Sequence, residues 1–322
     1  MGAILCFHSV TTPGLPAEGT AHVPLEAFRS YIRVASRLGR FVPLGELVQR
    51  HAQGRSTSGL IALTLDDAYA SLCSEFRDLV SREALPIAIF VVTRAAAKGA
   101  TYWWDRIEDL FPRVESARWR ALEAACGVPE EYRRGQPRDH GPLRPLRQWL
   151  LASYAGRWPD HLEPALAALE REVGHQTRHR SMTFQELADL AAMPGVELGV
   201  HTVSHPVLPL LPDEDLAQEV AAGFATLRER FRSVLPILAI PFGLYDERTV
   251  RFARSAGMTT CLSLGGGLVD GQLDHQVLPR ICINRGETSA RLGLRLLGVP
   301  DLVRRCLGRP PESYPDLPSA TT

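Results

Sequence analysis

Short apolar runs recur along the chain, and they predict buried strands. The runs are brief and carry few charges, a pattern typical of strands that are covered on both faces of a parallel sheet. The strands expected from them cover residues 3–7, 60–65, 86–92, 196–200, 235–240, 259–264 and 277–283.

Amphipathic stretches separate these runs and predict helices. In the first of them, Phe28, Ile32 and Leu38 share one face and arginines occupy the other. The helices expected in this way cover residues 25–38, 70–81, 183–194, 212–231 and 247–255. The alternation of strands with helices predicts an α/β fold of about six to eight parallel units, closed or nearly closed as a barrel.

Two parts of the chain depart from this alternation. From about 101 to 180 the sequence is rich in Arg, Glu, Ala and Leu, which predicts a mainly helical insertion in a single domain spanning 1–322. A basic segment, about 287–322, follows the last strand. Two interpretations of it stay open: a helix packed on the barrel, and weak contact with a membrane surface.

Composition narrows the class of protein. The chain has 322 residues, enough for a sizeable core, and 36 basic and 36 acidic residues balance, so no overall charge attracts nucleic acid. No run approaches the ~18 apolar residues of a membrane span, and no signal-peptide pattern opens the chain, so we expect a cytoplasmic protein. The six cysteines form no CxxC pair and are expected to be buried thiols.

Two of the predicted strands end in residues that bind metals. His201 and His205 follow the strand at 196–200, and Asp66 and Asp67 follow the strand at 60–65. Because the carboxyl ends of parallel strands meet at one edge of a sheet or barrel, we expect these side chains to share a site. Two imidazoles and one carboxylate are the three protein ligands that a catalytic zinc ion requires. The second carboxylate would then act as general base for a metal-bound water that attacks a carbonyl.

Simpler interpretations compete with this site. Histidines four residues apart also occur as surface or packing residues. The aspartate pair would equally serve as the cap and first-turn acid of the helix that follows.

Three stretches resemble the first motifs of the polysaccharide deacetylase family, also called the NodB homology domain or carbohydrate esterase family 4. They are residues 64–68 (Thr-Leu-Asp-Asp-Ala), 201–205 (His-Thr-Val-Ser-His) and 240–243 (Ile-Pro-Phe-Gly). The resemblance covers most of the chain outside 101–180. It implies a distorted (β/α)7-type barrel that removes N- or O-acetyl groups from sugars with a divalent metal ion, often zinc.

By position, the resemblance makes Asp66 the general base and assigns the metal to Asp67, His201 and His205. It places Pro241 against the substrate. The backbone N–H of Phe242 would help to stabilise the oxyanion of the tetrahedral intermediate, with plain packing as the alternative for this residue.

The sequence departs from the family pattern at several positions. Ala68 stands where glycine is frequent, and Ala239 stands where an arginine often pairs with the catalytic aspartate. The fourth and fifth motifs, the latter the source of the general acid, are not recognisable.

Residues elsewhere in the chain are candidates for the missing roles. His8, at the end of the first strand, and His275, before the last one, are candidates for the general acid, and we favour His8. Arg280 would either pair with Asp66 or bind substrate.

The predicted function is therefore metal-dependent removal of an N-acetyl group from an amino sugar or glycan precursor. Trp103 and Trp104 could stack on sugar rings, although core packing of the insertion is the favoured interpretation. A cytoplasmic location favours a sugar nucleotide, a small glycoside or a lipid-linked precursor as substrate. The alternatives are an O-deacetylase or deformylase, and a catalytically inactive glycan-binding module, against which the retained Asp66 argues.

Overall fold

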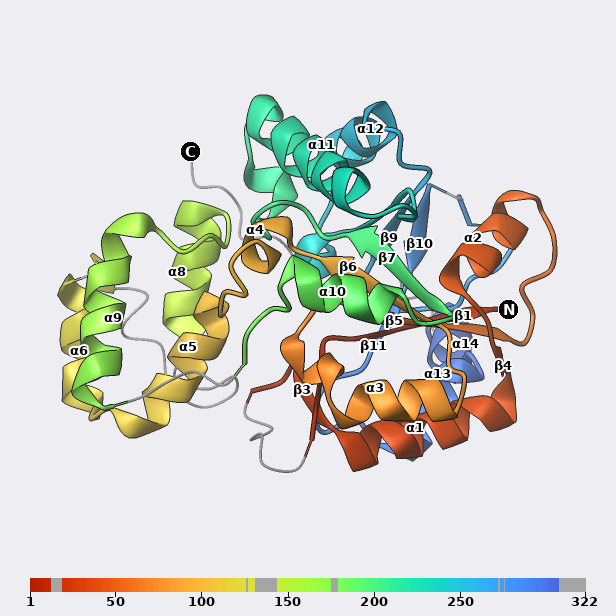
Figure 1. Ribbon diagram of the computed structural model, residues 1–322, viewed down its shortest axis with the longest axis horizontal. Coiled ribbons are helices and arrows are strands. Elements are labelled where there is room, and N and C mark those ends of the chain that lie inside the picture. Colours follow the sequence, from red (N-terminus) through yellow and green to blue (C-terminus); the bar gives the residue numbers. More distant parts are fainter. Residues whose placement is uncertain are drawn as a thin grey trace.

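The computed structural model describes residues 1–12, 19–125, 127–130, 144–174, 179–271, 273–274 and 276–306. Its barrel strands are β1 (Ala3–Phe7), β5 (Leu60–Leu65), β6 (Ile87–Val91), β7 (Val196–Val200), β8 (Ile237–Ala239), β9 (Thr260–Ser263), β10 (Val277–Pro279) and β11 (Ile281–Cys282). They are hydrogen-bonded in the order β10-β9-β8-β7-β6-β5-β1-β11, and every pair along this path is parallel (Figure 1). The sheet is a nearly closed barrel, which confirms the predicted α/β fold class.

The barrel closes at one stretch that pairs on both sides. β10 pairs with β9 and β11 pairs with β1, and only Arg280 separates the two short strands. Taken as one interrupted strand, they bring the path to the seven positions of a (β/α)7-type barrel. Arg280 therefore lies in the seam where the sheet closes. Three shorter strands lie off this path: β4 (Arg40–Phe41) pairs with β5, and β2 (Ser9–Thr11) pairs with β3 (His22–Pro24).

Helices cover the outside of the barrel (Figure 1). They are α1 (Leu25–Leu38), α2 (Leu44–Ala52), α3 (Glu75–Arg82), α4 (Thr93–Ala96), α10 (Phe184–Ala191), α11 (Asp213–Arg230), α12 (Glu247–Ser255), α13 (Ser289–Leu296) and α14 (Val299–Cys306). Phe28 and Ile32 are buried, but the predicted burial of Leu38 is wrong, since this last residue of α1 is 38% exposed. The helix predicted at 70–81 is also interrupted, because Ser74 has a non-helical backbone (φ −110°, ψ −137°) between a 3₁₀ turn and α3.

The described residues between 101 and 180 form a helical lobe beside the barrel and contain no strand (Figure 1). Its helices are α5 (Trp103–Leu110), α6 (Ser116–Ala125), α8 (Arg144–Tyr154) and α9 (Glu163–Glu172). An apolar cluster of its own fills the lobe, centred on Ile107, Leu150 and Leu166. Arg106 binds Glu163 and Glu170 with two N–H donors each, at 2.7–2.9 Å. These bonds fix α5, and with it Trp103 and Trp104, against α9.

The C-terminal helix α13 packs on the barrel, but both C-terminal helices expose apolar side chains. α13 packs on α1 and buries Leu292, as the packed-helix interpretation predicts. Leu294, Leu297 and Leu302 nevertheless remain 49%, 60% and 62% exposed. Residues 307–322 of the predicted basic segment lie outside the described residues.

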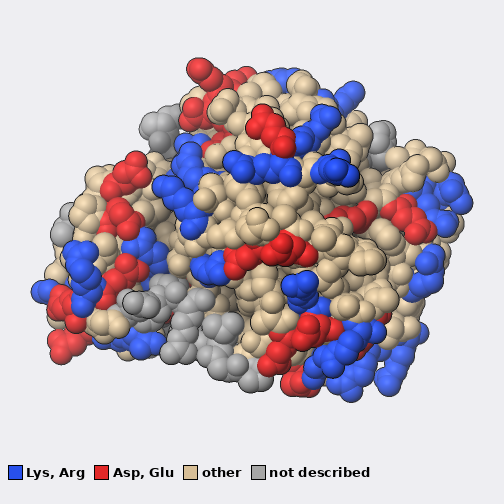
Figure 2. All heavy atoms as spheres, in the orientation of Figure 1, with Lys and Arg blue, Asp and Glu red and all other residues tan. Residues whose placement is uncertain are grey.

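The apolar length of the helices and the distribution of surface charge bear on contact with membranes and nucleic acids. Among the described helices, none is both long and apolar enough to cross a bilayer. Acidic and basic side chains are interspersed on the face shown in Figure 2, so no broad field of one sign covers it.

Candidate active site

The carboxyl ends of β5 and β7 meet at a pocket of about 260 Å³ between the barrel and the helical lobe. Its lining includes the predicted Asp66, Asp67, His201 and His205, together with Trp103 and Trp104 of α5. A larger groove of about 780 Å³ lies beside α12, but its lining residues are mostly half-buried or exposed. The smaller pocket brings four buried titratable side chains together.

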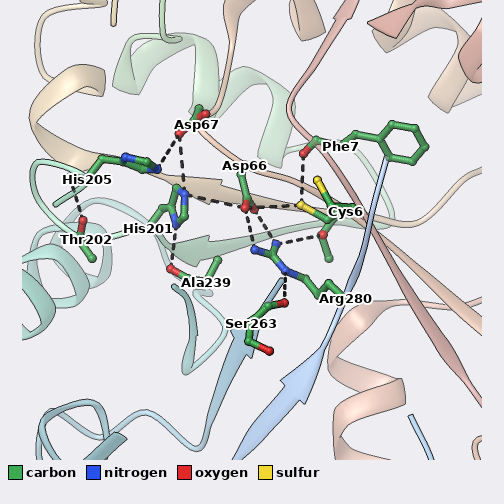
Figure 3. Close-up of polar contacts among 12 residues, drawn as sticks. Cys6, Phe7, Asp66, Asp67, His201, Thr202, His205, Ala239, Ser263 and Arg280 are labelled. Atoms are coloured by element: carbon green, nitrogen blue, oxygen red, sulfur yellow. Dashed lines mark hydrogen bonds and ion pairs between the residues drawn. The ribbon is translucent and has the colours of Figure 1, made fainter. Parts of the chain in front are cut away.

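Three of these side chains converge on one point. The Nε2 atoms of His201 and His205 each lie 3.7 Å from Oδ1 of Asp67 (Figure 3). All three residues are buried, and Oδ1 of Asp67 accepts no hydrogen bond from the described residues. A buried carboxylate oxygen facing two imidazole nitrogens is costly unless a cation lies between them. The donor set matches the two histidines and one carboxylate of catalytic zinc sites.

Backbone contacts fix the orientation of His201. Its Nδ1 lies 2.7 Å from the carbonyl oxygen of Ala239, which can only accept, so Nδ1 carries the proton (Figure 3). Nε2 is therefore left unprotonated toward Asp67, as a metal ligand requires. The turn that follows is closed by Thr202, whose Oγ1 accepts the backbone N–H of His205 at 3.0 Å.

Glu219 of α11 holds the loop that carries both histidines. Its carboxylate accepts the backbone N–H groups of Val203 and Ser204 at 3.0 and 2.8 Å, and also the hydroxyl of Ser204. Arg157 donates to the same carboxylate at 3.1 Å. Glu219 is only 5% exposed, so these bonds lie in a largely dry environment. The spacing of residues in the sequence gave no indication of this role.

We expect Glu219→Gln to loosen the histidine loop. Both backbone N–H groups bind Oε2, so an amide oxygen at that position leaves the NH2 group facing the donors of Ser204 and Arg157, and the negative charge that strengthens all four bonds is lost. The expected loss is about 1–3 kcal/mol of unfolding free energy and about 10- to 100-fold in zinc affinity. Urea unfolding and chelator competition measure the two effects. Glu214→Gln, an exposed acid on the same helix, is the control, and equal zinc affinity of the two variants would contradict the assignment.

Arg280 forms the main ion pair of the site. Its Nη1 and Nη2 each donate to one oxygen of Asp66 at 2.7 Å, and both residues are almost fully buried (Figure 3). Of the two interpretations of Arg280, the structure shows the pairing with Asp66. The substrate-binding role predicted for Arg280 is not supported, because the side chain is fully buried and is not among the residues that line the pocket.

The charges of the site follow from burial and from this pair. Burial alone would raise the pKa of Asp66, but the charge of Arg280, with a further contribution from His201, holds it well below its ordinary value. Burial lowers the pKa of both histidines, which favours the neutral imidazole that a metal ligand requires. Burial and the neighbouring Asp66 raise the pKa of Asp67 well above its ordinary value, so this carboxylate needs a nearby cation to stay ionised.

Backbone strain gathers around the pocket. Among the described non-glycine residues, seven have positive φ angles, and five of them lie in the three motifs. Those five are Asp67 (66°), Ala68 (51°), Thr202 (66°), His205 (61°) and Phe242 (59°). Such conformations persist where the surrounding structure enforces them, and they concentrate at functional sites. The conformation of Ala68 also explains why glycine is common at this position of the family motif.

Gly243 allows the third motif to turn. Its φ is +72°, and a Cβ atom there would lie 2.6 Å from the backbone nitrogen of Leu264. We expect Gly243→Ala to lower the unfolding free energy by about 2–4 kcal/mol, from backbone strain and overpacking together. Gly54→Ala is the matched control, since Gly54 also has a positive φ (+66°) but an added Cβ would meet no atom within 4 Å. Similar losses in urea unfolding of the two variants would show that Leu264 is not the obstacle.

The remaining predicted residues are distributed around the pocket. His8 lines it, and Phe242 packs its ring against His205 with the centroids 4.7 Å apart, while Pro241 is buried in the same turn. Trp103 lines the pocket and also donates from Nε1 to the carbonyl of Gly156 at 3.0 Å, so both interpretations of this residue fit its position. His275 lies outside the described residues.

Sequence reasoning missed a second polar layer behind the pocket. Tyr102 donates its hydroxyl to the carbonyl of Asp67 at 2.6 Å, and its ring stacks on Trp104 with the centroids 4.5 Å apart. Tyr69 accepts from Nε1 of Trp104 at 3.0 Å and donates to buried Asp105 at 2.8 Å. From the sequence, these aromatic residues are expected to be core residues. Nothing in their spacing shows that they support the backbone of Asp67.

Comparison with known proteins agrees with the motifs. The polysaccharide deacetylase family model matches residues 149–261, which include His201, His205 and the Pro241–Gly243 turn but not Asp66 and Asp67. The match confirms the resemblance to polysaccharide deacetylases. No curated protein sequence matches the chain.

Solved deacetylase structures share the fold. The deacetylase PplD of Streptococcus pyogenes, in complex with acetate, is 13% identical (TM-score 0.58), and the match covers 91% of this chain and 97% of that one. IcaB of Ammonifex degensii is 15% identical (TM-score 0.59), with 92% and 96% covered. A de-N-acetylase of Aggregatibacter actinomycetemcomitans is 11% identical (TM-score 0.56), with 91% and 99% covered. At these identities the likeness shows a common fold.

Proposed function

We propose that this protein is a metal-dependent deacetylase that hydrolyses the N-acetyl group of an amino sugar or glycan precursor. The observation that carries the proposal is the convergence of Asp67, His201 and His205 on one point, with ionised Asp66 beside them. The polysaccharide deacetylase family and fold support the same reaction class.

The three ligands fit a divalent ion with nitrogen and oxygen preference, and zinc is our proposal. When bound, such an ion would polarise the acetyl carbonyl and make water a better nucleophile. Asp66 accepts the proton of the attacking water, because Arg280 keeps it ionised at neutral pH. The N–H of Phe242 is the proposed donor to the developing oxyanion.

His8 is the proposed proton donor to the leaving amine. Burial lowers its pKa to about 4, so it is neutral in the free protein at pH 7. An anionic intermediate beside it would raise this pKa and favour protonation during the reaction. Trp103 and Trp104 offer aromatic faces on which the sugar ring would stack.

The test is acetate release from N-acetylated and O-acetylated amino-sugar oligomers, with zinc-loaded and chelated protein. Release from the N-acetyl substrate that is lost on chelation and in His201→Ala is the expected result. Release from the O-acetyl substrate alone would favour the O-deacetylase. Glycan binding without acetate release, unchanged by His201→Ala, would favour the inactive binding module.

The substrate class depends on location, which we propose to be cytoplasmic. This location favours a sugar nucleotide, a small glycoside or a lipid-linked precursor. A lipid-linked substrate would suit weak membrane contact through the exposed Leu294, Leu297 and Leu302. Replacing the three leucines by serine is then expected to reduce co-sedimentation with anionic vesicles, and unchanged sedimentation would end this idea.

A further inference from the structure

The barrel seam brings a second group of metal-binding side chains to the pocket. Side chains alternate along a strand, so Cys6 and His8, two residues apart in and just after β1, point to the same side. Cys282 of β11 is in register with Cys6 on the neighbouring strand, so its side chain points to that side too. His8 and Cys282 line the pocket, and Cys6 is buried beneath them.

The three side chains are close enough to share one ion. Their ligand atoms, two sulfurs and one imidazole nitrogen, all lie within 4.8 Å of one another. A tetrahedral zinc ion with bonds of about 2.0–2.3 Å requires ligand atoms to be less than about 4 Å apart, so they must draw together by at most about 1 Å. His8 and Cys282 are only half-buried, which leaves their side chains room for this adjustment.

The local hydrogen bonds leave the group available. Nδ1 of His8 is buried and has no hydrogen-bond partner among the described residues. Sγ of Cys6 contacts Asp66 at 3.5 Å and the carbonyl oxygen of Phe7 at 3.7 Å, and Sγ of Cys282 donates to Asn284 at 3.5 Å; thiols are weak donors. An imidazole nitrogen of His8 and the two thiol sulfurs thus lie close together, and the thiols have only weak hydrogen bonds to lose.

We propose that Cys6, His8 and Cys282 form a second metal site, separate from that of Asp67, His201 and His205, which binds zinc or a similar thiophilic ion with one coordination position open to the pocket. Two thiolates and an imidazole are an established zinc donor set, and thiolates select softer ions than carboxylates do. The proposal needs no assumption about the deacetylase reaction.

The surroundings shift the pKa values of the two thiols in opposite directions. Arg280 is permanently cationic and acts on both thiols. The neighbouring thiol of Cys6, together with the Arg280 charge, lowers the pKa of Cys282 even though burial opposes this. Burial raises the pKa of Cys6, so this thiol ionises only when the ion arrives and offsets the cost. A His8 bound to the ion cannot at the same time serve as proton donor, so the second site and that proposed role of His8 exclude each other.

Cobalt provides a test that separates the two sites. Full-length protein, kept reduced to exclude a Cys6–Cys282 disulfide, is titrated with Co²⁺ and followed by absorption and by bound metal. We expect about two ions per chain and a near-ultraviolet thiolate-to-cobalt charge-transfer band. Only the cysteine site can give this band, because the ligands of the other site contain no sulfur.

The variants assign the band. Cys282→Ser is expected to lose the band and one ion, and His8→Ala to weaken both, while Cys73→Ser, which removes a half-buried thiol elsewhere, keeps them. His201→Ala should lose the other ion and keep the band, so failure of the deacetylase site is distinguishable. A folded, reduced wild-type protein with one ion and no band would overturn the proposal, as would a band that survives Cys282→Ser.

Discussion

Asp66→Asn is expected to reduce acetate release by about 10²- to 10⁴-fold, the usual contribution of a positioned general base. Asparagine has nearly the same shape as aspartate but cannot accept the proton of the attacking water. Asp66 lies 3.8 Å from Nε2 of His201 but is bound by Arg280 and is not one of the three grouped ligands, so metal content is expected to stay near one ion per chain at that site. The variant thus separates the base from the ligands.

Steady-state kinetics on the N-acetylated substrate, beside metal analysis, measures this outcome. The expected pattern is a lower kcat with little change in KM, because the base acts in the transition state. Asp189→Asn, an exposed acid on α10, controls for the substitution itself. If Asp66→Asn kept full activity, Asp66 would be only a structural partner of Arg280, and the base would have to be sought elsewhere.

Most of the candidate site was predicted from the residues that follow the predicted strands. Asp66, Asp67, His201 and His205 each follow an apolar run, and parallel strands place such residues at one edge of a barrel. The chemistry of the ligands then restricted the possibilities to a metal site. This prediction depends only on the local apolar pattern and on the common direction of the strands. Errors of a few residues at element boundaries therefore do not change it.

The register of the strands and the contacts between distant parts of the chain could not be predicted in this way. Cys6 and Cys282 are direct neighbours across β1 and β11 but lie near opposite ends of the sequence. The apolar patterns of the two strands do not show that the strands pair. Glu219 reads as one of many acids on an amphipathic helix, although its carboxylate holds the histidine loop. Such contacts depend on how the barrel closes, and a one-residue slip would face each side chain the other way.

The arginine partner of Asp66 shows how closure compensates for a missing motif residue. Ala239 occupies the position from which the family arginine would reach the catalytic aspartate. Arg280 makes a bidentate pair with that aspartate from the barrel seam instead. Ala239 still contributes to the site, because its backbone carbonyl oxygen orients His201. If Asp66 is the base, as proposed, its guanidinium partner comes from a different strand than the family pattern indicates.

Arg280→Met is accordingly expected to lower the unfolding free energy by about 3–5 kcal/mol at pH 7, because it leaves Asp66 buried without a partner. Methionine fills much of the same volume, so the loss reports the charge pair rather than a cavity. Urea unfolding measures it. Arg118→Met is the control, since Arg118 forms its ion pair with Glu172 at the surface, where it contributes little.

The pH dependence of this loss has a defined sign. In the wild-type protein the folded-state pKa of Asp66 is lowered, so the pair stabilises the fold above the unfolded-state pKa of about 4, and this stabilisation is lost as the pH falls further. Without Arg280, burial raises the folded-state pKa of Asp66. Protonation of Asp66 as the pH falls then removes the unpaired buried charge, so the variant loses less unfolding free energy. The stability gap between the two proteins should therefore narrow from pH 7 toward pH 5, and the acidic limb of the variant's pH–rate profile should move to higher pH.

A second substitution isolates the pair itself. In an Asp66→Asn background, Arg280→Met removes a cation that no longer faces a carboxylate, so its cost should fall well below that in the wild-type background. The difference is the coupling free energy of the two side chains, and contacting charges in a dry site give values of about 0.5–3 kcal/mol. Equal costs in the two backgrounds would mean that Arg280 stabilises the seam through packing, and that the low pKa of Asp66 has another source.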